Sequence, residues 1–339
     1  MKHHPLISVL CFVALVLVIS LACSISVDPG EVSDIATQVS DIVDSIEIVI
    51  TEEPPTNSGN TEDPPGNTEI GPAPDGMVLI PAGNFQMGCA TTSMFDCSEA
   101  RFGTGGSHEV PLHTVYMDSY FIDINEVTNS QYAQCVAAGA CQPPVSHTYE
   151  GQLIYNDNHY GDPQYGNFPI TNIPWVDGDN YCTWVGKSLP SEAQWEKAAR
   201  GSSDTRIWPW GNTPPNCSLL NFRAGGDPDW CGINVNGVVT AAVGSHPQGA
   251  SPYGVMDMAG NVEEWVLDMG ISDYYSYFEP DAWPSNPISG DRKPIYGKPE
   301  HIVRGGPWNT DSIGVRVSTR VFGGGGPSTL IGFRCAANP

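Results

Sequence analysis

The chain has 339 residues, of which 37 are Gly, 30 are Pro and 15 % are charged. This composition is typical of a loop-rich fold and not of a helical bundle, and the length accommodates one large domain or two ordinary ones. With 14 basic and 38 acidic residues the formal net charge is −24, which excludes a protein that binds nucleic acid by bulk neutralisation of phosphates. The excess of acid also fits a solvated, soluble surface.

Residues 1–23 have the pattern of an export signal. A basic start at Lys2 precedes a long apolar run that ends in "SLAC" at Cys23, and the run is marginal for a membrane-spanning helix. "SLAC" resembles a bacterial lipobox in which Cys23 carries lipid, although Ser20 and Leu21 depart from the usual residues. We expect an exported, cell-surface or membrane-anchored lipoprotein, with plain secretion and an uncleaved anchor as the alternatives.

Residues 24–76 contain no Lys or Arg and are rich in Asp, Glu, Pro, Thr, Asn and Gly. Such a segment cannot bury enough apolar surface to fold, so we predict an acidic, disordered stalk. Apolar residues at helical spacing within 35–46 allow either a short helix near the membrane or a transient helix without a role. The acidity opposes docking on anionic lipid, so membrane attachment would come from the lipid on Cys23.

Sequence patterns typical of strands and helices begin at Met77, and we interpret residues 77–339 as one domain. "MVLIPAGNFQMG" predicts a strand, a turn at Pro81-Ala82-Gly83 and a second strand. "TVYMDSYFIDINEVTN" alternates between apolar and polar residues and then reaches Thr128. We expect Thr128 to cap a helix over "NSQYAQCVAAG".

Two further segments predict helices. "WVDGDNYCTWVG" indicates a short helix capped by Asp177 or Asp179, with its Trp and Tyr side chains facing inward, and capping is preferred over a pair of acid–base carboxylates. "LPSEAQWEKAARG" has Ser191 at the cap, Gln194 to complete a capping box and Gly201 to end the helix. Turns and short segments follow. The pattern predicts a single α+β domain of short strands, two or three helices and long loops.

We expect the cysteines of an exported chain to form disulfides, because the compartments outside the cytoplasm are oxidising. Of the 10 cysteines, discarding Cys11 and Cys23 leaves eight, an even number. Spacing favours three local pairs and leaves one long-range pair: Cys89 with Cys97, Cys135 with Cys141, Cys217 with Cys231, and Cys182 with Cys335. The sequence does not fix this connectivity. A zinc site is less favoured, because the chain has no C-x-x-C pair and no suitably spaced pair of histidines.

Seven segments carry a resemblance to a known family. In chain order they are "MVLIPAGNFQMG", "EVTNSQY", "NYCTWVGKSLPSEAQWEKAARG", "PWGN", "SPYGVMDMAGNVEEW", "RGGPW" and "GFRCAA". Together they cover nearly all of 77–339, and the chain resembles the sulfatase-modifying-factor family, typified by the formylglycine-generating enzyme. The resemblance implies that family's variant of the C-type-lectin-like fold, an α+β, loop-rich domain with a small mixed sheet and few helices.

The resemblance also implies a chemistry, which depends on segment 305–320, "GGPWNTDSIGVRVSTR". The family's enzyme oxidises a cysteine of a client sulfatase to formylglycine, using oxygen and a copper ion held by two thiolates in this segment. Here the segment has no cysteine, and Thr310 stands about where the first would be. A hydroxyl is neither soft nor ionised at neutral pH, so it cannot replace a copper thiolate. Cys335 does not substitute, because its "GFRC" context matches a structural disulfide cysteine of the family, partnered by Cys182. We therefore expect neither copper nor a catalytic residue.

Calcium is the cofactor that the resemblance implies instead. One family site, built from two side-chain oxygens and two backbone carbonyls, matches Asp257, Gly260, Val262 and Glu264. A second site matches less securely, with an asparagine in place of an aspartate, at Asn221, Phe222, Asn236 and Val238. Both ions would be structural. The alternative role of Asp257 and Glu264 is to cap turns.

The functional prediction is a surface-exposed, non-catalytic domain that binds a protein, peptide or glycan, because loops on a rigid scaffold commonly carry recognition. Its binding face is predicted to include Trp308, Asn309, Thr310, Asp311, Ser312 and Ile313, with the glycine run 323–326. Some retroelement-diversified proteins use this fold and vary the same loop. The alternatives are a formylglycine-generating oxidase with an unrecognised arrangement and a structural envelope component. The aromatic stretch "SDYYSYFEPDAWP" (272–284) either packs internally or binds sugar or peptide, and packing is preferred.

Overall fold

The computed structural model describes residues 71–90, 108–145, 148–149, 152–153, 159–224, 231, 239–270, 274–276, 283–288 and 300–339. The chain divides into two compact units, Met1–Thr68 and Glu69–Pro339, and every described residue belongs to the second. The predicted signal and all but the last six residues of the predicted stalk lie outside the described residues, as do Cys97, Asn236 and Val238. Within the described ranges, no helix is long and apolar enough to cross a membrane.

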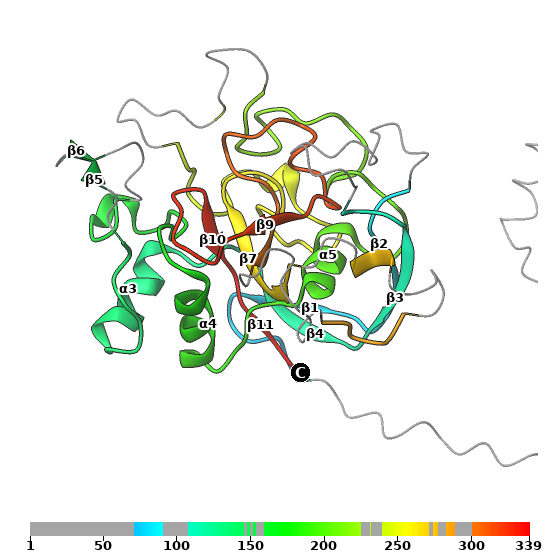
Figure 1. Ribbon diagram of the computed structural model, residues 1–339, viewed down its shortest axis with the longest axis horizontal. Coiled ribbons are helices and arrows are strands. Elements are labelled where there is room, and N and C mark those ends of the chain that lie inside the picture. The colour runs from blue at the N-terminus through cyan, green and yellow to red at the C-terminus, as the bar shows by residue number, and fades with distance from the viewer. Residues whose placement is uncertain are drawn as a thin grey trace, which may run out of the picture. The chain divides into compact units, whose positions relative to one another are not determined.

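Short strands and few helices make up the described unit (Figure 1). The strands are β1 (Met77–Ile80), β2 (Gly83–Met87), β3 (His113–Met117), β4 (Tyr120–Asp123), β5 (Thr148–Tyr149), β6 (Gln152–Leu153), β7 (Glu263–Met269), β8 (His301–Arg304), β9 (Val321–Gly323), β10 (Ile331–Phe333) and β11 (Ala336–Ala337). The α-helices are α3 (Asn129–Ala137), α4 (Trp175–Trp184) and α5 (Glu192–Arg200). This confirms the predicted loop-rich α+β domain.

A mixed sheet in the order β10-β7-β8-β9 forms the centre of the domain. β10 runs parallel to β7, whereas β7, β8 and β9 are antiparallel. Because side chains alternate along a strand, the sheet has two buried faces. Trp265 and Val303 pack in one apolar cluster with residues of α3 and α4, and Val266 and Ile302 pack in another with α5, β2 and β3. Figure 1 shows α3 and α4 on one side of this sheet and α5 with β2 and β3 on the other.

The two strands predicted at the start of the domain are confirmed, but they do not pair with each other. β1 pairs with β4, placing Met77 opposite Asp123, and β2 pairs with β3, placing Phe85 opposite Val115. β11 completes the β1 sheet on the other edge of β4. The turn at Pro81 therefore passes the chain from one sheet to another, which local sequence patterns cannot indicate.

The caps predicted for α3 and α5 are confirmed. Thr128 and Gln131 form a capping box at α3, and Ser191 and Gln194 form one at α5. Each pair satisfies two N–H groups that a helix start leaves without partners. α5 ends at Gly201, whose φ of 84° lies in the left-handed region that glycine tolerates.

The predicted start of α4 is wrong. Pro174, and neither Asp177 nor Asp179, is the N-cap residue, and it makes no side-chain capping bond. Tertiary contacts fix the start instead, because the Trp175 ring stacks on His301 at 4.0 Å and its Nε1 donates to the Val266 carbonyl at 2.8 Å. Both aspartates lie inside the helix, where burial raises their pKa.

The inward orientation predicted for the aromatic side chains of α4 holds only in part. Tyr181 is 6 % exposed and packs on Phe333. Trp184 is 40 % exposed, so the prediction is wrong at this position. The difference follows from helix geometry, because residues three apart are offset by about 60° around the axis.

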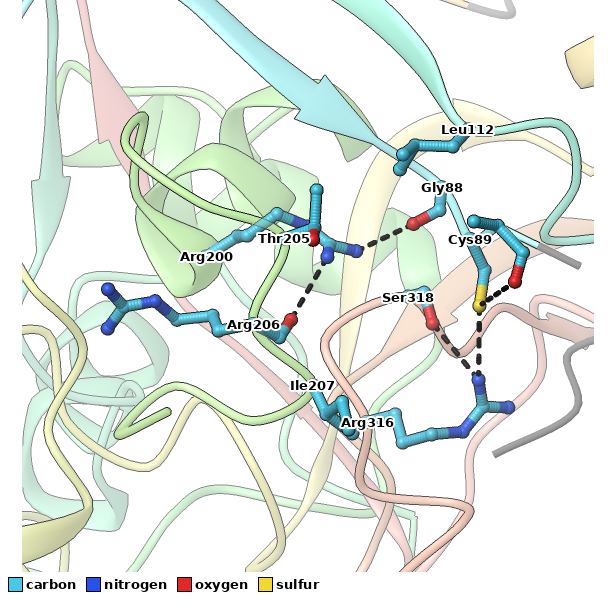
Figure 2. A pocket seen from close by; sticks show the side chains of 10 residues that line it. Gly88, Cys89, Leu112, Arg200, Thr205, Arg206, Ile207, Arg316 and Ser318 are labelled. Atoms are coloured by element: carbon cyan, nitrogen blue, oxygen red, sulfur yellow. Dashed lines mark hydrogen bonds between the residues drawn. The ribbon is translucent and has the colours of Figure 1, made fainter. Parts of the chain in front are cut away.

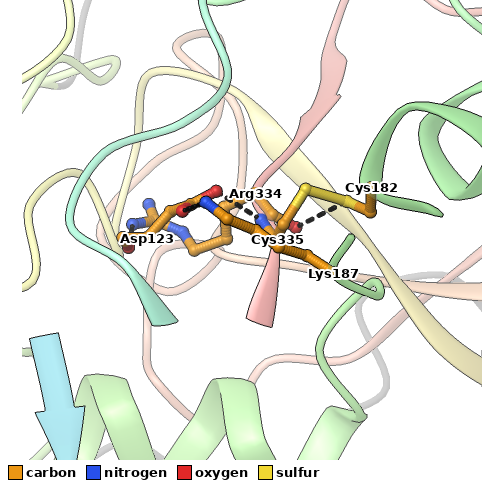
Figure 3. Close-up of a disulfide and its surroundings, with 5 residues drawn as sticks. All are labelled: Asp123, Cys182, Lys187, Arg334 and Cys335. Atoms are coloured by element: carbon orange, nitrogen blue, oxygen red, sulfur yellow. Dashed lines mark hydrogen bonds and ion pairs between the residues drawn. A yellow bond between two sulfur atoms is a disulfide. The ribbon is translucent and has the colours of Figure 1, made fainter. Parts of the chain in front are cut away.

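The described disulfides confirm the predicted pairing. Cys135–Cys141, Cys217–Cys231 and Cys182–Cys335 are joined. Cys89 is also disulfide-bonded, and its predicted partner lies outside the described residues. The Cys182–Cys335 bond ties α4 to the chain between β10 and β11, beside the Lys187–Asp123 ion pair of 2.6 Å (Figure 3).

The described aromatic residues of 272–284 pack internally, as preferred from the sequence. Tyr274 and Tyr275 are buried, and Trp283 stacks on His113 at 3.9 Å between ring centroids. His113 Nδ1 donates to the Pro111 carbonyl at 2.8 Å. Within the described part of the chain, its Nε2 is buried without a hydrogen-bond partner. This histidine is therefore held in its neutral form.

Acidification should destabilise the domain through His113. Burial lowers the pKa of His113 in the folded state to about 4, whereas an unfolded chain has a histidine pKa of about 6.5. As the pH falls from about 6.5 to 4, the unfolded state takes up the proton first, so stability is lost over this window, by roughly 3 kcal/mol at most. We expect His113→Phe to flatten this part of the urea-unfolding profile against pH. An unchanged slope would contradict the prediction.

Candidate functional site

The predicted binding loop leaves the end of β8 and returns at the start of β9. Three segments hold its backbone. The Trp308 N–H donates to the Asn261 carbonyl at 2.9 Å, and the Arg223 N–H donates to the Thr310 carbonyl at 2.9 Å. Trp208 Nε1 donates to the Ser312 carbonyl at 3.1 Å. All six predicted face residues, 308–313, are half-buried. The loop is thus a fixed surface whose side chains remain partly open to solvent.

Thr310 packs against Gly314 inside this loop. A Cβ built on Gly314 would lie 3.1 Å from the Thr310 Cβ and 2.1 Å from its Oγ1. The threonine side chain therefore fills the space where a second side chain would face it. The backbone reaches this contact through Gly305 and Gly306, whose φ angles of 93° and 70° require glycine.

The glycine run 323–326 does not join this face, contrary to the prediction. His301 lies opposite Gly323 and Val303 lies opposite Val321 in the β8–β9 pair. The loop begins where β8 ends, so the loop and the glycine run occupy opposite ends of the pair. Packing requires a glycine at position 323, because a Cβ there would lie 2.5 Å from the Trp265 ring. The candidate binding face is accordingly limited to 308–313.

Buried ion pairs hold the C-terminal end of the loop, and no pattern in the sequence predicted them. Arg316 binds Glu109 through two hydrogen bonds of 2.8 and 2.9 Å. Arg320 binds Glu192 in the same bidentate manner. The partners are 207 and 128 residues apart, so no spacing rule reveals them. Since Arg316 Nε also donates to the Ile313 carbonyl at 2.9 Å, the ion pairs fix the end of the loop.

The residues present do not fit a copper site of the family's kind. Seven cysteines lie in the described ranges, and each is part of a disulfide: Cys89, Cys135, Cys141, Cys182, Cys217, Cys231 and Cys335. A disulfide sulfur is not a thiolate ligand. The described residues therefore offer no thiolate pair for Cu(I), and the loop offers a hydroxyl at Thr310.

The first predicted calcium site forms a tight turn before β7. Three residues of this turn have left-handed φ angles, Asp257 at 55°, Gly260 at 77° and Asn261 at 61°. Non-glycine residues persist there only where the surroundings hold them. Among the described residues, no backbone or side-chain N–H donates to the carbonyls of Gly260 and Val262, so both are available as oxygen ligands.

Carboxylates outnumber cations around this turn. Burial and the neighbouring Asp257 and Glu264 carboxylates raise the pKa of Glu126 well above its usual value. Glu264 is neutralised by Arg334 through two bonds of 2.7 Å, and burial raises the pKa of Asp257. Glu126 accepts from Asn261 Nδ2 at 2.9 Å. Among the described residues, the Arg334 guanidinium is thus the counter-ion of three acidic side chains. A bound cation would reduce this excess of acidic groups.

In the described part of the chain, no group of three or more His, Cys, Asp or Glu side chains is arranged to hold a metal ion. The first predicted calcium site has only two carboxylates and takes its other ligands from the backbone.

The second predicted calcium site is half outside the described residues. In the described half, the Phe222 carbonyl accepts from the Cys231 N–H at 3.2 Å and the Asn221 carbonyl from the Asn261 N–H at 2.8 Å. These backbone bonds make the second site the weaker candidate.

A small mixed sheet with few helices, extensive ordered coil and a long return loop defines a C-type-lectin-like scaffold of the formylglycine-generating-enzyme type. The model of the "Sulfatase-modifying factor enzyme 1-like domain" matches residues 63–339. The chain belongs to this family, which confirms the resemblance seen in the sequence motifs.

Two kinds of relative share the domain. The formylglycine-generating enzyme of Thermomonospora curvata is 29 % identical over 304 residues, which cover 78 % of this chain and 94 % of that protein. The serine/threonine-protein kinase pkn1 of Chlamydia pneumoniae is 30 % identical over 273 residues, covering 77 % of this chain. This chain spans only 38 % of the length of that kinase.

Solved structures agree on the fold. PvdO from Pseudomonas aeruginosa superposes with a TM-score of 0.57 at 26 % identity, covering 78 % of this chain and 94 % of PvdO. Treponema denticola variable protein 1 gives a TM-score of 0.50 at 19 % identity, covering 78 % and 95 %. The second likeness concerns the fold alone.

Proposed function

We propose that this chain is a surface-displayed, non-catalytic member of the family that binds a protein, peptide or glycan through loop 308–313. The observation that carries the proposal is the chemistry of segment 305–320. The family resemblance places the first copper-binding cysteine at about position 310. This chain has Thr310 there, and its side chain packs on Gly314. Every described cysteine is committed to a disulfide. The scaffold that presents the loop is retained, while the groups that the family's oxidation needs are missing from it.

The proposal also takes up the sequence-based expectations about the rest of the chain. A lipid on Cys23 would anchor the exported protein, and the acidic segment 24–76 would hold the domain away from the surface. Exposure to an oxidising compartment is supported by the disulfides of the domain. A disulfide-rich domain on a stalk of this predicted kind would suit recognition of a partner at a distance from the membrane.

The first test separates binding from catalysis. The purified chain is incubated with a cysteine-containing sulfatase-motif peptide, copper, oxygen and a reductant, and the peptide mass is measured. The Thermomonospora curvata enzyme serves as the positive control. We expect no change in peptide mass with this chain. Conversion of the thiol to the aldehyde would overturn the non-catalytic assignment.

The second test addresses the loop itself. We expect Asn309→Arg and Ser312→Arg to reduce capture of a partner from envelope extracts or a glycan array by at least about tenfold, because long charged side chains disrupt a packed interface. Asn180→Arg is the matched control, since Asn180 is exposed on α4, far along the chain from the loop. Equal loss in all three variants would show that the loop is not the binding face.

We further propose that calcium binds at Asp257, Gly260, Val262 and Glu264, supported by the free carbonyls and by the excess of buried carboxylates. Calcium at 100 times its Kd should stabilise the folded state by about 2.7 kcal/mol. We expect Asp257→Asn to abolish the rise in Tm that calcium causes. Asp179→Asn, a half-buried acid of α4, should keep it. A calcium-independent Tm in the chelator-treated wild type would refute the site.

A further inference from the structure

A polar pocket lies where the end of β4 and the start of α3 meet the C-terminal end of α4. Its volume is about 300 Å³, at the lower end of the range of about 300–1,000 Å³ for small-molecule sites. Its lining comes from segments 75–76, 123–131 and 181–187 and from positions 167 and 243, all within the described ranges. Loop 308–313 contributes no residue to this lining, so the pocket is separate from the proposed binding face.

Backbone hydrogen bonds hold the walls of the pocket together. The Ile124 N–H donates to the Gly76 carbonyl at 2.9 Å, which joins the segment before β1 to the end of β4. The Val243 N–H donates to the Asn167 carbonyl at 2.9 Å, which joins the two single positions of the lining. The pocket is therefore formed without a ligand, as is usual for small-molecule sites.

Two side chains of the lining have acceptor atoms that no described residue uses. Tyr181 is 6 % exposed and lines the pocket, and its hydroxyl hydrogen-bonds to no described residue. Burial and the nearby Asp123 carboxylate raise the pKa of Tyr181 to about 12, so the hydroxyl lies on the side of the ring that faces another lining residue. Asn125 Oδ1 is buried without a hydrogen-bond partner among the described residues. Buried acceptors of this kind are normally satisfied, here by a group that enters the pocket.

The charge of the lining is negative. It contains the acids Asp75, Asp123 and Glu126 and the single base Lys187. Lys187 is paired with Asp123 at 2.6 Å (Figure 3), so its charge is compensated. Within the described residues, neither Asp75 nor Glu126 forms an ion pair, and the bond that Glu126 accepts at 2.9 Å comes from the uncharged amide of Asn261. The pocket therefore offers negative charge that no neighbouring base neutralises.

A smaller pocket at the end of β2 differs in this respect (Figure 2). Its cation Arg316 is held by Glu109 through two bonds of 2.8 and 2.9 Å, and Arg200 is held by Glu196 through bonds of 3.2 and 2.8 Å. Those charges are compensated within the protein. The pocket beside α3 is thus the one that calls for a charged ligand.

We propose that the pocket beside α3 binds a primary ammonium group on an aliphatic stem, the chemistry of a lysine side chain or of a free polyamine. An ammonium group carries three donors and no acceptor, which suits a pocket of unused acceptors and unpaired acids. The stem has apolar wall to pack on, because Val127, Val185 and Val243 line the same pocket. The inference does not depend on what loop 308–313 binds.

The test titrates the full chain with n-butylammonium chloride, followed by isothermal titration and by the Tm. Calcium is held in excess throughout, so that the turn before β7 stays in one state. Sodium chloride at matched ionic strength and n-butanol are the references for charge and for the apolar stem. Asn167→Lys places an ammonium group at the pocket, where it should occupy the acceptors itself. Asn84→Lys is the matched control, because Asn84 is as exposed as Asn167 and does not line the pocket.

We expect saturable binding by the wild type and Asn84→Lys, weakened at least about tenfold in Asn167→Lys because a tethered group competes at high effective concentration. Tyr181→Phe keeps the ring and removes the hydroxyl, so it should weaken binding about fivefold. Unliganded Tm values check that each variant folds. Equal binding by the two lysine variants, or a response to n-butanol as strong as that to n-butylammonium, would overturn the proposal.

Two further probes distinguish the sources of the ammonium group. Stronger binding of lysine blocked at both its amino and carboxyl ends indicates a peptide ligand, and stronger binding of spermidine indicates a free polyamine. Ser312→Arg should bind n-butylammonium as the wild type does. Loss of ammonium binding in that variant would contradict the separation of the pocket from the loop.

Discussion

Replacing Thr310 and Gly314 together with cysteine will cross-link the loop. The Cβ positions are 3.1 Å apart, a few tenths of an ångström closer than in ordinary disulfides, so a small opening of the loop brings the two sulfurs into bonding geometry. Gly314 has no left-handed φ angle, so its backbone accepts a side chain. We expect intact mass to show one additional disulfide after oxidation and stoichiometric Cu(I) binding after reduction.

The single variants are the controls for this result. Thr310→Cys alone and Gly314→Cys alone should each add one free thiol to the chain and bind Cu(I) weakly at the loop, because one thiolate does not chelate. Two free thiols that stay uncross-linked in the double variant would show that the Thr310–Gly314 contact is not maintained in solution. A double variant that also oxidises the sulfatase-motif peptide would show that the scaffold lacks only its thiolates.

Arg334→Met should destabilise the domain by about 3–5 kcal/mol, the range for removing one partner of a buried ion pair. Arg334 is fully buried and binds Glu264 through two bonds of 2.7 Å. Its other N–H groups donate to the carbonyls of Asp123, Ile124 and Met256 at 2.9–3.1 Å. One side chain therefore ties β10 to β7, to the end of β4 and to the turn before β7. Urea unfolding measures the effect.

Arg206→Met is the control for this loss, because Arg206 pairs with an Asp204 side chain that is 48 % exposed, and such pairs contribute about 0–1 kcal/mol. Calcium offers a second check. Removing Arg334 leaves Glu126, Asp257 and Glu264 without their cation, so calcium should stabilise the Arg334→Met variant more than it stabilises the wild type. A loss below about 1 kcal/mol in Arg334→Met would contradict the role given to this ion pair.

Features that depend on neighbours in sequence could be predicted from the sequence. The capping boxes at Thr128 and Ser191 involve residues three apart, so their geometry is complete within one helical turn. The Cys135–Cys141 and Cys217–Cys231 bonds close short loops, with sequence separations of 6 and 14. The absence of cysteine from 305–320 is likewise a property of the sequence alone. The family and its fold followed from the order of the motifs.

Features that depend on distant residues were decided by the tertiary structure. Stacking on His301 fixed the start of α4 at Pro174, overriding the capping tendency of Asp177. The register of β8 and β9 separated the glycine run from loop 308–313.

The buried ion pairs next to the loop have the same physical reason. Arg316 and Glu109 are 207 positions apart in the chain, and Arg320 and Glu192 are 128 positions apart. A sequence gives the number of charges, but burial and pairing decide which of them compensate one another. The sequence by itself therefore determined the family, the fold class and the absence of cysteine from 305–320, whereas the tertiary structure decided which distant charged side chains meet.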